Sequence, residues 1–398
     1  MIYLLVFGIL LVGILFDKEK ESKNAKIWWI VEWLVLVLLM GFRYRVGADS
    51  LGYEDMYPQM ETFSDLVRIN DWTELRYMPL WHIFVALCLS FSDEFVVLQM
   101  IEAVIVNSII FWFIKKYANR PFLTVLFYFF MIYPYYNTEI QRQVLSVCCF
   151  LLGIPSLIKG KYIRYYLWSI VGLGFHHSSV FILIIPPVYS YMKNMGTKST
   201  ISFLLIFVVG LVFVTQLDTV SSLMKYMGMI QLSSSMSHND VNHTTLIGVI
   251  YRLLTEWLLV CLFLIVCKNQ KKEEKAFLAI YVFTAGIAIP VYLMYRVIDF
   301  LWIPLYIIIL NNLDRFVLSK NSIGREHKRK RLFYGVLSVL VVLNVFITRI
   351  QYYTLDREEI TNKKGTYMYN MYIPYHSVFD PEKDDVREDL HYNDAIAF

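Results

Sequence analysis

Long apolar blocks alternate with short charged segments along the whole of this 398-residue chain. The blocks are roughly 15 to 20 residues long, the length of a helix that crosses a hydrocarbon core about 30 Å thick. Apolar and polar residues do not alternate with a period of two, so the pattern favours helices over a β-barrel. Twelve spans are predicted, at residues 2–16, 27–42, 95–114, 122–136, 144–158, 165–175, 180–192, 201–216, 246–266, 276–294, 300–318 and 332–347.

The predicted fold class is therefore an all-α, polytopic membrane protein. Residues 1–348 form the transmembrane helical domain with external loops at 43–94 and 217–245, and residues 349–398 form an external C-terminal tail. The apolar segment 79–91 is too short for a full crossing, and we expect it to re-enter the membrane or to lie at its interface.

The composition agrees with this fold class. Hydrophobic residues make up 57% of the chain and charged residues 18%, with a mean hydropathy of +0.50, outside the usual range of soluble proteins. None of the five cysteines has the spacing of a metal site. We expect no metal, no cofactor and no nucleic-acid partner.

The basic residues divide unevenly between the two sides of the membrane. Six short loops on one side hold 22 of the 37 Lys and Arg, as 17 Lys and 5 Arg, which predicts a cytoplasmic side and places both termini outside. The outer side before the tail carries seven Arg and one Lys. A guanidinium grips phosphate or carboxylate through two parallel hydrogen bonds, so this excess of Arg indicates an anion bound outside; the alternative is pairing with lipid headgroups.

Three glycines within residues 41–53 mark the outer end of the second predicted span. They favour the end of the helix at Gly41 and a turn in which the backbone can approach a ligand closely. Arg43, Arg45 and Asp49 can converge in this turn. The alternative is that these charges only neutralise one another at a helix end.

A second polar turn, residues 137–143, carries Glu139, Arg142 and Gln143 between two strongly apolar helices. If the turn is helical, Glu139 and Arg142 lie on one face. An exposed ion pair contributes less than about 1 kcal/mol, so stability alone is a weak reason for these charges.

Adjacent histidines, His176 and His177, stand at the tip of a hairpin between the short predicted spans 165–175 and 180–192. Arms of this length reach less than the hydrocarbon thickness, so we expect the tip to lie below the outer surface. A histidine there can act as a general base or donate a hydrogen bond to a sugar. For at least one of the two, the alternative is a packing role.

A further outer turn carries Arg296 and, three residues later, Asp299. Within the ninth span, Arg252 and Glu256 are four residues apart. Charges inside a membrane are paired or functional, and for Arg252 and Glu256 pairing with each other is a sufficient explanation.

Four motifs follow one another along the chain: Phe42-Arg43-Tyr44 with Val46-Gly47 and Asp49, then Arg142-Gln143, then Phe175-His176 with Ser178, then Arg296 before Phe300. In this order of motifs the chain resembles the EpsG-like branch of the Wzy-type bacterial polysaccharide polymerases, over nearly its whole length. Ala48 stands where threonine is usual in that family, and Met78 stands where many members carry glutamate, with Glu74 as a nearby substitute.

The resemblance implies a metal-independent glycosyltransferase of GT-C-like architecture in the bacterial cytoplasmic membrane, with its active site facing the exterior or periplasm. Such an enzyme joins undecaprenyl-pyrophosphate-linked repeat units, as donor and acceptor, into surface polysaccharide. Expected partners are these glycolipids, membrane lipids, and the chain-length regulator and flippase of the same pathway.

The resemblance also implies roles for the candidate residues. Arg142 and Arg296, with Arg43 or Arg45, would hold the pyrophosphate and stabilise its developing charge. The acceptor hydroxyl would lose its proton to His176, with Asp49 orienting a partner or serving as the alternative base. The remaining residues expected to bind substrate are Gln143, Glu139, His177 and Asp299.

Two other functions stay open from the sequence. An O-antigen ligase uses the same donor but passes the glycan to a different acceptor. A flippase or other transporter would also bind a charged glycolipid, but transporters commonly show repeated halves and binding residues at the midplane. This chain has no evident repeat, and its polar clusters fall on outer turns.

Overall fold

The structure, a computed structural model, divides the chain into two compact units. The first unit comprises Met1–Leu183 and Phe346–Phe398, and the second comprises Ile184–Val345. The residues that the structure describes are 2–69, 71–72, 75–196, 198–199, 201–203, 205–206, 253–266, 271–288, 295–315 and 325–395.

Five helices among the described residues are long and apolar enough to cross a membrane. Each coincides with a predicted span, which confirms the all-α, membrane-spanning fold class. The other predicted spans and the GT-C-like architecture stay predictions, and most of span 201–216 and the whole of loop 217–245 lie outside the described residues. The five helices are Lys23–Gly41, Phe95–Tyr117, Gln141–Ile158, Tyr295–Leu313 and Gly335–Tyr353.

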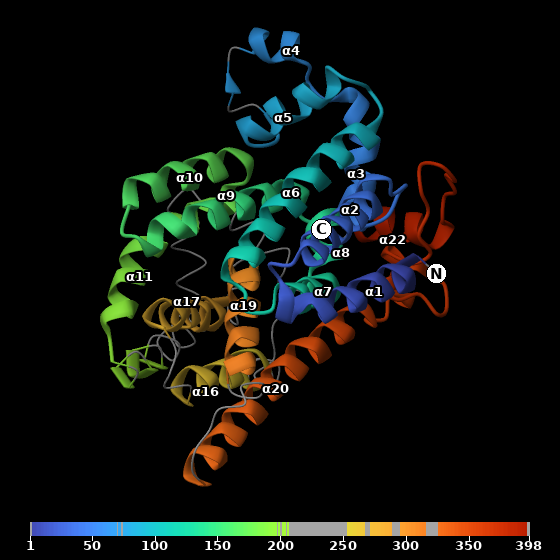
Figure 1. Ribbon diagram of the computed structural model, residues 1–398. Helices are drawn as coiled ribbons and strands as arrows, with labels where there is room; N and C mark the ends of the chain where they lie inside the picture. Colours follow the sequence, from blue (N-terminus) through green and yellow to red (C-terminus); the bar gives the residue numbers. More distant parts are fainter. Residues whose placement is uncertain are drawn as a thin grey trace. The chain divides into compact units, whose positions relative to one another are not determined.

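The first unit contains most of the helices that Figure 1 labels. Small residues at the contact between α9 and α10 let these two helices pack closely, and α2 runs along α6. Its elements are α1 (Ile2–Gly13), η1 (Ile14–Glu19), α2 (Lys23–Gly41), α3 (Ala48–Met56), η2 (Tyr57–Gln59), α4 (Phe63–Arg68), α5 (Pro79–Leu89), α6 (Phe95–Tyr117), α7 (Pro121–Met131), α8 (Tyr133–Thr138), α9 (Gln141–Ile158), α10 (Tyr162–Phe175), η4 (His177–Ile184), α21 (Glu358–Thr361), η10 (Met368–Met371) and α22 (Asp385–Ala395).

One predicted span of the first unit is broken in the structure. Instead of one helix over residues 122–136, α7 ends at Met131 and the short α8 follows. Pro134 explains the break, because a proline inside a helix removes a hydrogen bond and clashes with the carbonyl four residues earlier. Because of this break, the short α8 separates α7 from the polar turn that follows.

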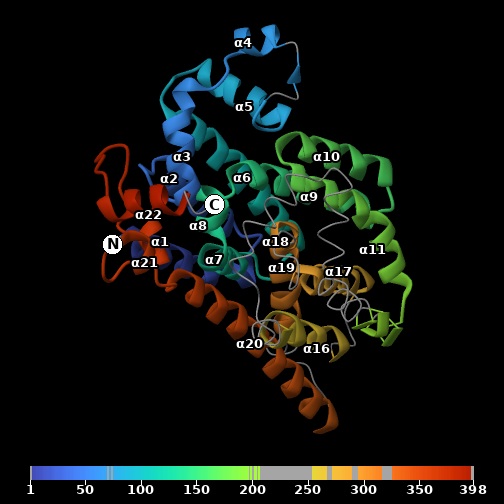
Figure 2. The same cartoon turned by 180° about the vertical axis from the view of Figure 1, so that it is seen from behind.

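The C-terminal tail folds back onto the first unit. Its helix α22 packs beside α3, as Figure 1 and the reverse view in Figure 2 both show. A small apolar core forms within the tail from Met368, Met371, Tyr372 and Leu390. The tail therefore lies over the turn between α2 and α3.

The second unit is built around α17, which packs against α11, α16 and α19. Glu274 on α17 forms two hydrogen bonds of 2.6 and 2.8 Å with the guanidinium of Arg315. The elements of this unit are α11 (Ile185–Asn194), η6 (Leu253–Leu258), α16 (Leu259–Val266), α17 (Lys272–Ala288), α18 (Tyr295–Ile298), η8 (Asp299–Leu301), α19 (Trp302–Leu313) and the first part of α20 (Arg325–Tyr353).

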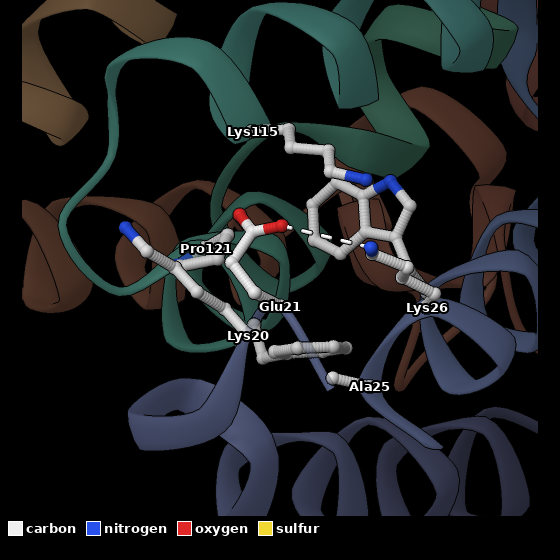
Figure 3. A pocket seen from close by; sticks show the side chains of 8 residues that line it. Lys20, Glu21, Ala25, Lys26, Lys115 and Pro121 are labelled. Atoms are coloured by element: carbon white, nitrogen blue, oxygen red, sulfur yellow. Dashed lines mark ion pairs between the residues drawn. The ribbon is translucent and has the colours of Figure 1, made fainter. Parts of the chain in front are cut away.

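A shallow cavity of about 50 Å³ lies in the first unit, where α2 and α7 begin and α6 ends. Figure 3 shows Lys20, Lys26 and Lys115 around it, with Lys26 paired to Glu21 at 3.8 Å. The lysines around this cavity belong to loops that are predicted to be cytoplasmic. None of the predicted site residues lines this cavity, and the turn that carries Arg43 lies at the opposite end of α2.

Candidate functional site

The turn between α2 and α3 has an unusual backbone. Helix α2 ends at Gly41, as predicted, but α3 then begins at Ala48 and continues through Gly52. Arg45 and Gly47 have φ angles of +49° and +95°. A Cβ at Gly47 would lie 2.2 Å from the Cβ of Thr138, so both the φ angle and the available space require glycine here.

Arg43 is buried inside the first unit, with 1% of its surface exposed. Its guanidinium donates to the carbonyl of Met40 at 2.6 Å and to the Ser50 hydroxyl at 3.0 and 3.3 Å. The Gln99 amide donates to the Arg43 carbonyl at 3.1 Å. Burial lowers the pKa of Arg43, although nearby carboxyl groups oppose this. These contacts use Arg43 to tie α2 to α3.

Arg45 is also buried and is held by two carboxylates. It donates to both oxygens of Glu388 at 2.5 and 2.6 Å, and to Oδ1 of Asp55 at 2.8 Å. Burial opposes the charge, but the hydrogen bonds to Glu388 and Asp55 outweigh it and raise the pKa of Arg45. The side chain therefore links the tail to α3.

Glu139 caps the N-terminus of α3. Its carboxylate accepts the backbone N–H groups of Ala48 at 2.8 Å and of Asp49 at 3.3 Å, which satisfies donors that a helix leaves unpaired. Burial raises the pKa of Glu139, and the two backbone hydrogen bonds oppose this. The chain is not helical between α8 and α9, so Glu139 does not share a helix face with Arg142.

Arg142, in the first turn of α9, lies among aromatic side chains. Its Nε donates to the Tyr53 hydroxyl at 2.5 Å, and its Cζ lies 4.1 Å from the centre of the Tyr77 ring. The Tyr53 ring packs against Trp81 of α5, with centroids 5.4 Å apart. Burial raises the pKa of Tyr53, so this hydroxyl stays protonated beside the half-buried guanidinium.

Asp49 stands one helical turn before Tyr53 on α3 and is exposed. A carboxylate in the first turn of a helix is stabilised by the positive end of the helix dipole. Tyr53 thus connects two of the predicted site residues: it follows Asp49 along α3 and binds Arg142 directly.

His176 ends α10 and is buried. Its Nδ1 accepts the backbone N–H of Ser178 at 3.2 Å and lies 2.7 Å from the Ser178 hydroxyl. In the neutral ring this arrangement favours the proton on Nε2, because Nδ1 is an acceptor. The ring stacks on that of exposed His177, with centroids 4.3 Å apart.

His176 and Arg142 lie at the same end of the α9–α10 pair. The Ser146 hydroxyl and the His176 backbone N–H both donate to the carbonyl of Gly172, at 2.6 and 3.1 Å. Arg142 precedes Ser146 by one turn of α9, and His176 follows Gly172 by one turn of α10. Gln143, next to Arg142, is buried.

Arg296 and Asp299 belong to the second unit. Arg296 lies in α18, and Asp299, which is buried, begins η8. Their predicted part in binding the same substrate as Arg142 stays a prediction. Over the described residues, no three His, Cys, Asp or Glu side chains come together in a way that could hold a metal ion.

The aromatic neighbours of Arg142 were not predicted from the sequence. Tyr77 is itself fixed by His82, whose Nε2 accepts the Tyr77 backbone N–H at 3.3 Å while its Nδ1 lies 2.7 Å from Glu61. A Tyr or Trp beside an apolar helix is common, so nothing in the sequence separates Tyr53 and Tyr77 from other aromatic residues. Glu74 and Arg252 lie outside the described residues.

These features define a class of protein: an all-α membrane protein with a partly buried arginine, at the start of a helix, in contact with two tyrosines. The sequence model of the EpsG family matches residues 26–356, and the chain belongs to this family. No curated protein and no solved structure matches it. The family resemblance drawn from the motifs is thereby confirmed.

Proposed function

We propose that this protein joins polyprenyl-pyrophosphate-linked repeat units into a surface polysaccharide on the outer face of the bacterial cytoplasmic membrane. Membership of the EpsG family supports a role in polysaccharide synthesis. The observation that carries the proposal is Arg142, a half-buried cation held by Tyr77 and by Tyr53, which follows exposed Asp49 by one turn of α3.

Arg142 suits the leaving group of this reaction. The stacking of Arg142 on the Tyr77 ring uses no hydrogen-bond donor, and the hydrogen bond to Tyr53 uses Nε. Arg43 and Arg45 instead donate to partners inside the protein. We therefore assign pyrophosphate binding in the first unit to Arg142. The role predicted for Arg296 from the sequence stays a prediction.

In the proposed reaction the acceptor hydroxyl oxygen attacks the anomeric carbon of the donor. The bond from that carbon to the pyrophosphate oxygen breaks, and polyprenyl pyrophosphate leaves with the electron pair. Arg142 stabilises the charge that develops on this leaving group. The hydroxyl proton passes to a carboxylate or an imidazole nearby.

Asp49 is the better base of the two predicted candidates. Its side chain is exposed at the start of α3, whereas Nδ1 of His176 accepts a backbone N–H, an arrangement that in the neutral ring favours the proton on Nε2. His176 then serves as a hydrogen-bond donor to a substrate oxygen. This exchanges the roles predicted for His176, as the base, and Asp49, as its alternative. His177 keeps its predicted binding role.

Two substitutions separate these roles. Asp49→Asn removes the base but keeps the shape, and should lower the rate about 100-fold or more. His176→Gln keeps a side-chain donor and should lose about tenfold, within the contribution of one hydrogen bond. Rates are measured with lipid-linked repeat units extracted from a deletion strain. Full loss in His176→Gln with normal activity in Asp49→Asn would reverse the assignment.

A further inference from the structure

The family match ends at residue 356, yet the tail beyond it is built into the candidate site. Helix α22 packs on α3, which carries both Asp49 and Tyr53. The backbone of the tail also pairs with the turn between α2 and α3: the N–H of Gly47 donates to the carbonyl of Met371 at 2.8 Å, and that of Tyr44 to the carbonyl of His376 at 2.9 Å.

Arg387 of α22 is fully buried in this contact, with none of its surface exposed. Its guanidinium donates to three backbone carbonyls, those of Arg45 at 2.7 Å, Asn370 at 3.2 Å and Pro374. One side chain thus joins α22, the loop that precedes it and the turn at Arg45.

Two ion pairs and a hydroxyl strengthen the same contact. Glu388, next to Arg387, holds Arg45 through both carboxylate oxygens, and Arg45 in turn binds Asp55 at the far end of α3. The Tyr392 hydroxyl donates to the other oxygen of Asp55 at 2.5 Å. The positive φ of Arg45 is therefore maintained by partners on both α3 and α22.

We infer that the part of the C-terminal tail beyond the family match, residues 357–395, is a permanent part of the site. We also infer that Arg387 positions the turn from which α3 begins. Asp49 and Tyr53 are carried by α3, and Tyr53 fixes Arg142. Loss of Arg387 would remove the donor to three backbone carbonyls, of which that of Arg45 is in a buried hydrogen bond, and release the start of α3. This inference rests on the proposed function, because it assigns the tail to the site of that reaction.

The first test measures whether Arg387 keeps the tail docked on α3. The full chain, in detergent and with a C-terminal affinity tag, is digested with proteinase K, and loss of the tag is followed by blotting. Arg387→Ala should lose the tag about tenfold faster or more, the effect of losing one or more charged hydrogen bonds. Lys383→Ala, an exposed cation of the same tail, is the matched control and should behave as wild type.

The second test measures whether the held tail matters to the site. The same variants are supplied to the deletion strain, and purified protein is assayed with lipid-linked repeat units from that strain. A tail that only stabilises the fold would leave KM unchanged and scale the rate with the amount of folded protein. A positioning role raises KM or lowers kcat in the folded protein that remains.

Should Arg387→Ala fail to reach the membrane, Glu388→Gln decides, since it weakens only the pair with Arg45. Faster digestion together with altered KM or kcat supports the inference. Digestion at the wild-type rate, or faster digestion with unchanged kinetics, overturns it. The proposed function fails in a different way: deletion of the whole gene would then leave the polysaccharide unchanged.

Discussion

The arginines of the candidate site differ in what their guanidinium groups contact. Arg43 and Arg45 are buried and donate to carbonyl, hydroxyl and carboxylate oxygens of the protein itself. Arg142 contacts two tyrosines, one through its hydroxyl and one through its ring face. Sequence alone treats all three as equivalent cations on one side of the membrane. The contacts of Arg43 and Arg45 give these two a structural role, and we propose that Arg142 is the one that binds substrate.

We expect Arg142→Lys to lose polymer synthesis by about 100-fold or more, the effect of removing one transition-state donor. Lysine keeps the charge but not the planar fork or the stacking on Tyr77. Synthesis is measured as incorporation of lipid-linked repeat units into polymer. Exposed Arg68, changed in the same way, should have no effect. Activity of Arg142→Lys close to wild type would remove Arg142 from pyrophosphate binding.

At the scale of elements, the site depends on where helices end. Helix α8 ends at Thr138 and α9 begins at Gln141, so Glu139 turns towards α3 while Arg142 turns towards Tyr53 and Tyr77. The turn before α3 must also pass close to Thr138. Glycine at position 47 makes this passage possible.

Gly47→Ala should destabilise the protein by about 2 to 6 kcal/mol, from backbone strain together with overlap at Thr138. Gly160→Ala is the matched control, because Gly160 also has a positive φ but has open space around it. Its cost should be only about 1 to 2 kcal/mol. The thermal unfolding midpoint in detergent measures both. An equal loss of stability in Gly47→Ala and Gly160→Ala would show that the contact with Thr138 is unimportant.

Docking of α22 should weaken as the pH falls below about 6.5, the ordinary pKa of histidine. Burial lowers the pKa of His391, which faces Asp55, Arg45, Glu388 and the backbone of Ala48. The undocked state then binds more protons than the docked one, so stability is lost on acidification through this range. The unfolding midpoint should fall between pH 7.5 and 5.5, and less so in His391→Gln. An equal fall in both would exclude His391 as the cause.

The sequence predicted the spanning helices that the structure describes and the end of α2 at Gly41, because apolar length and glycine content are local properties. It did not predict that the tail docks on α3. Arg45 and Glu388 are 343 residues apart, and neither residue signals its partner. For the same reason Tyr53 and Tyr77 could not be assigned to Arg142.

At the scale of the whole molecule, two compact units carry different parts of the predicted site. The first holds Asp49, Arg142 and His176, and the second holds Arg296 and Asp299. The EpsG family match covers both units but ends before most of the tail. We propose that the whole chain polymerises lipid-linked repeat units.

The most direct test is deletion of the gene in its host, followed by gel analysis of the surface polysaccharide with and without the wild-type gene. We expect the deletion to remove the polymer ladder while single repeat units still reach the surface. Wild type should restore the ladder, and Arg142→Lys should not. Loss of all surface glycan, with lipid-linked units retained inside the cell, would contradict the proposed polymerase function and identify a transporter instead.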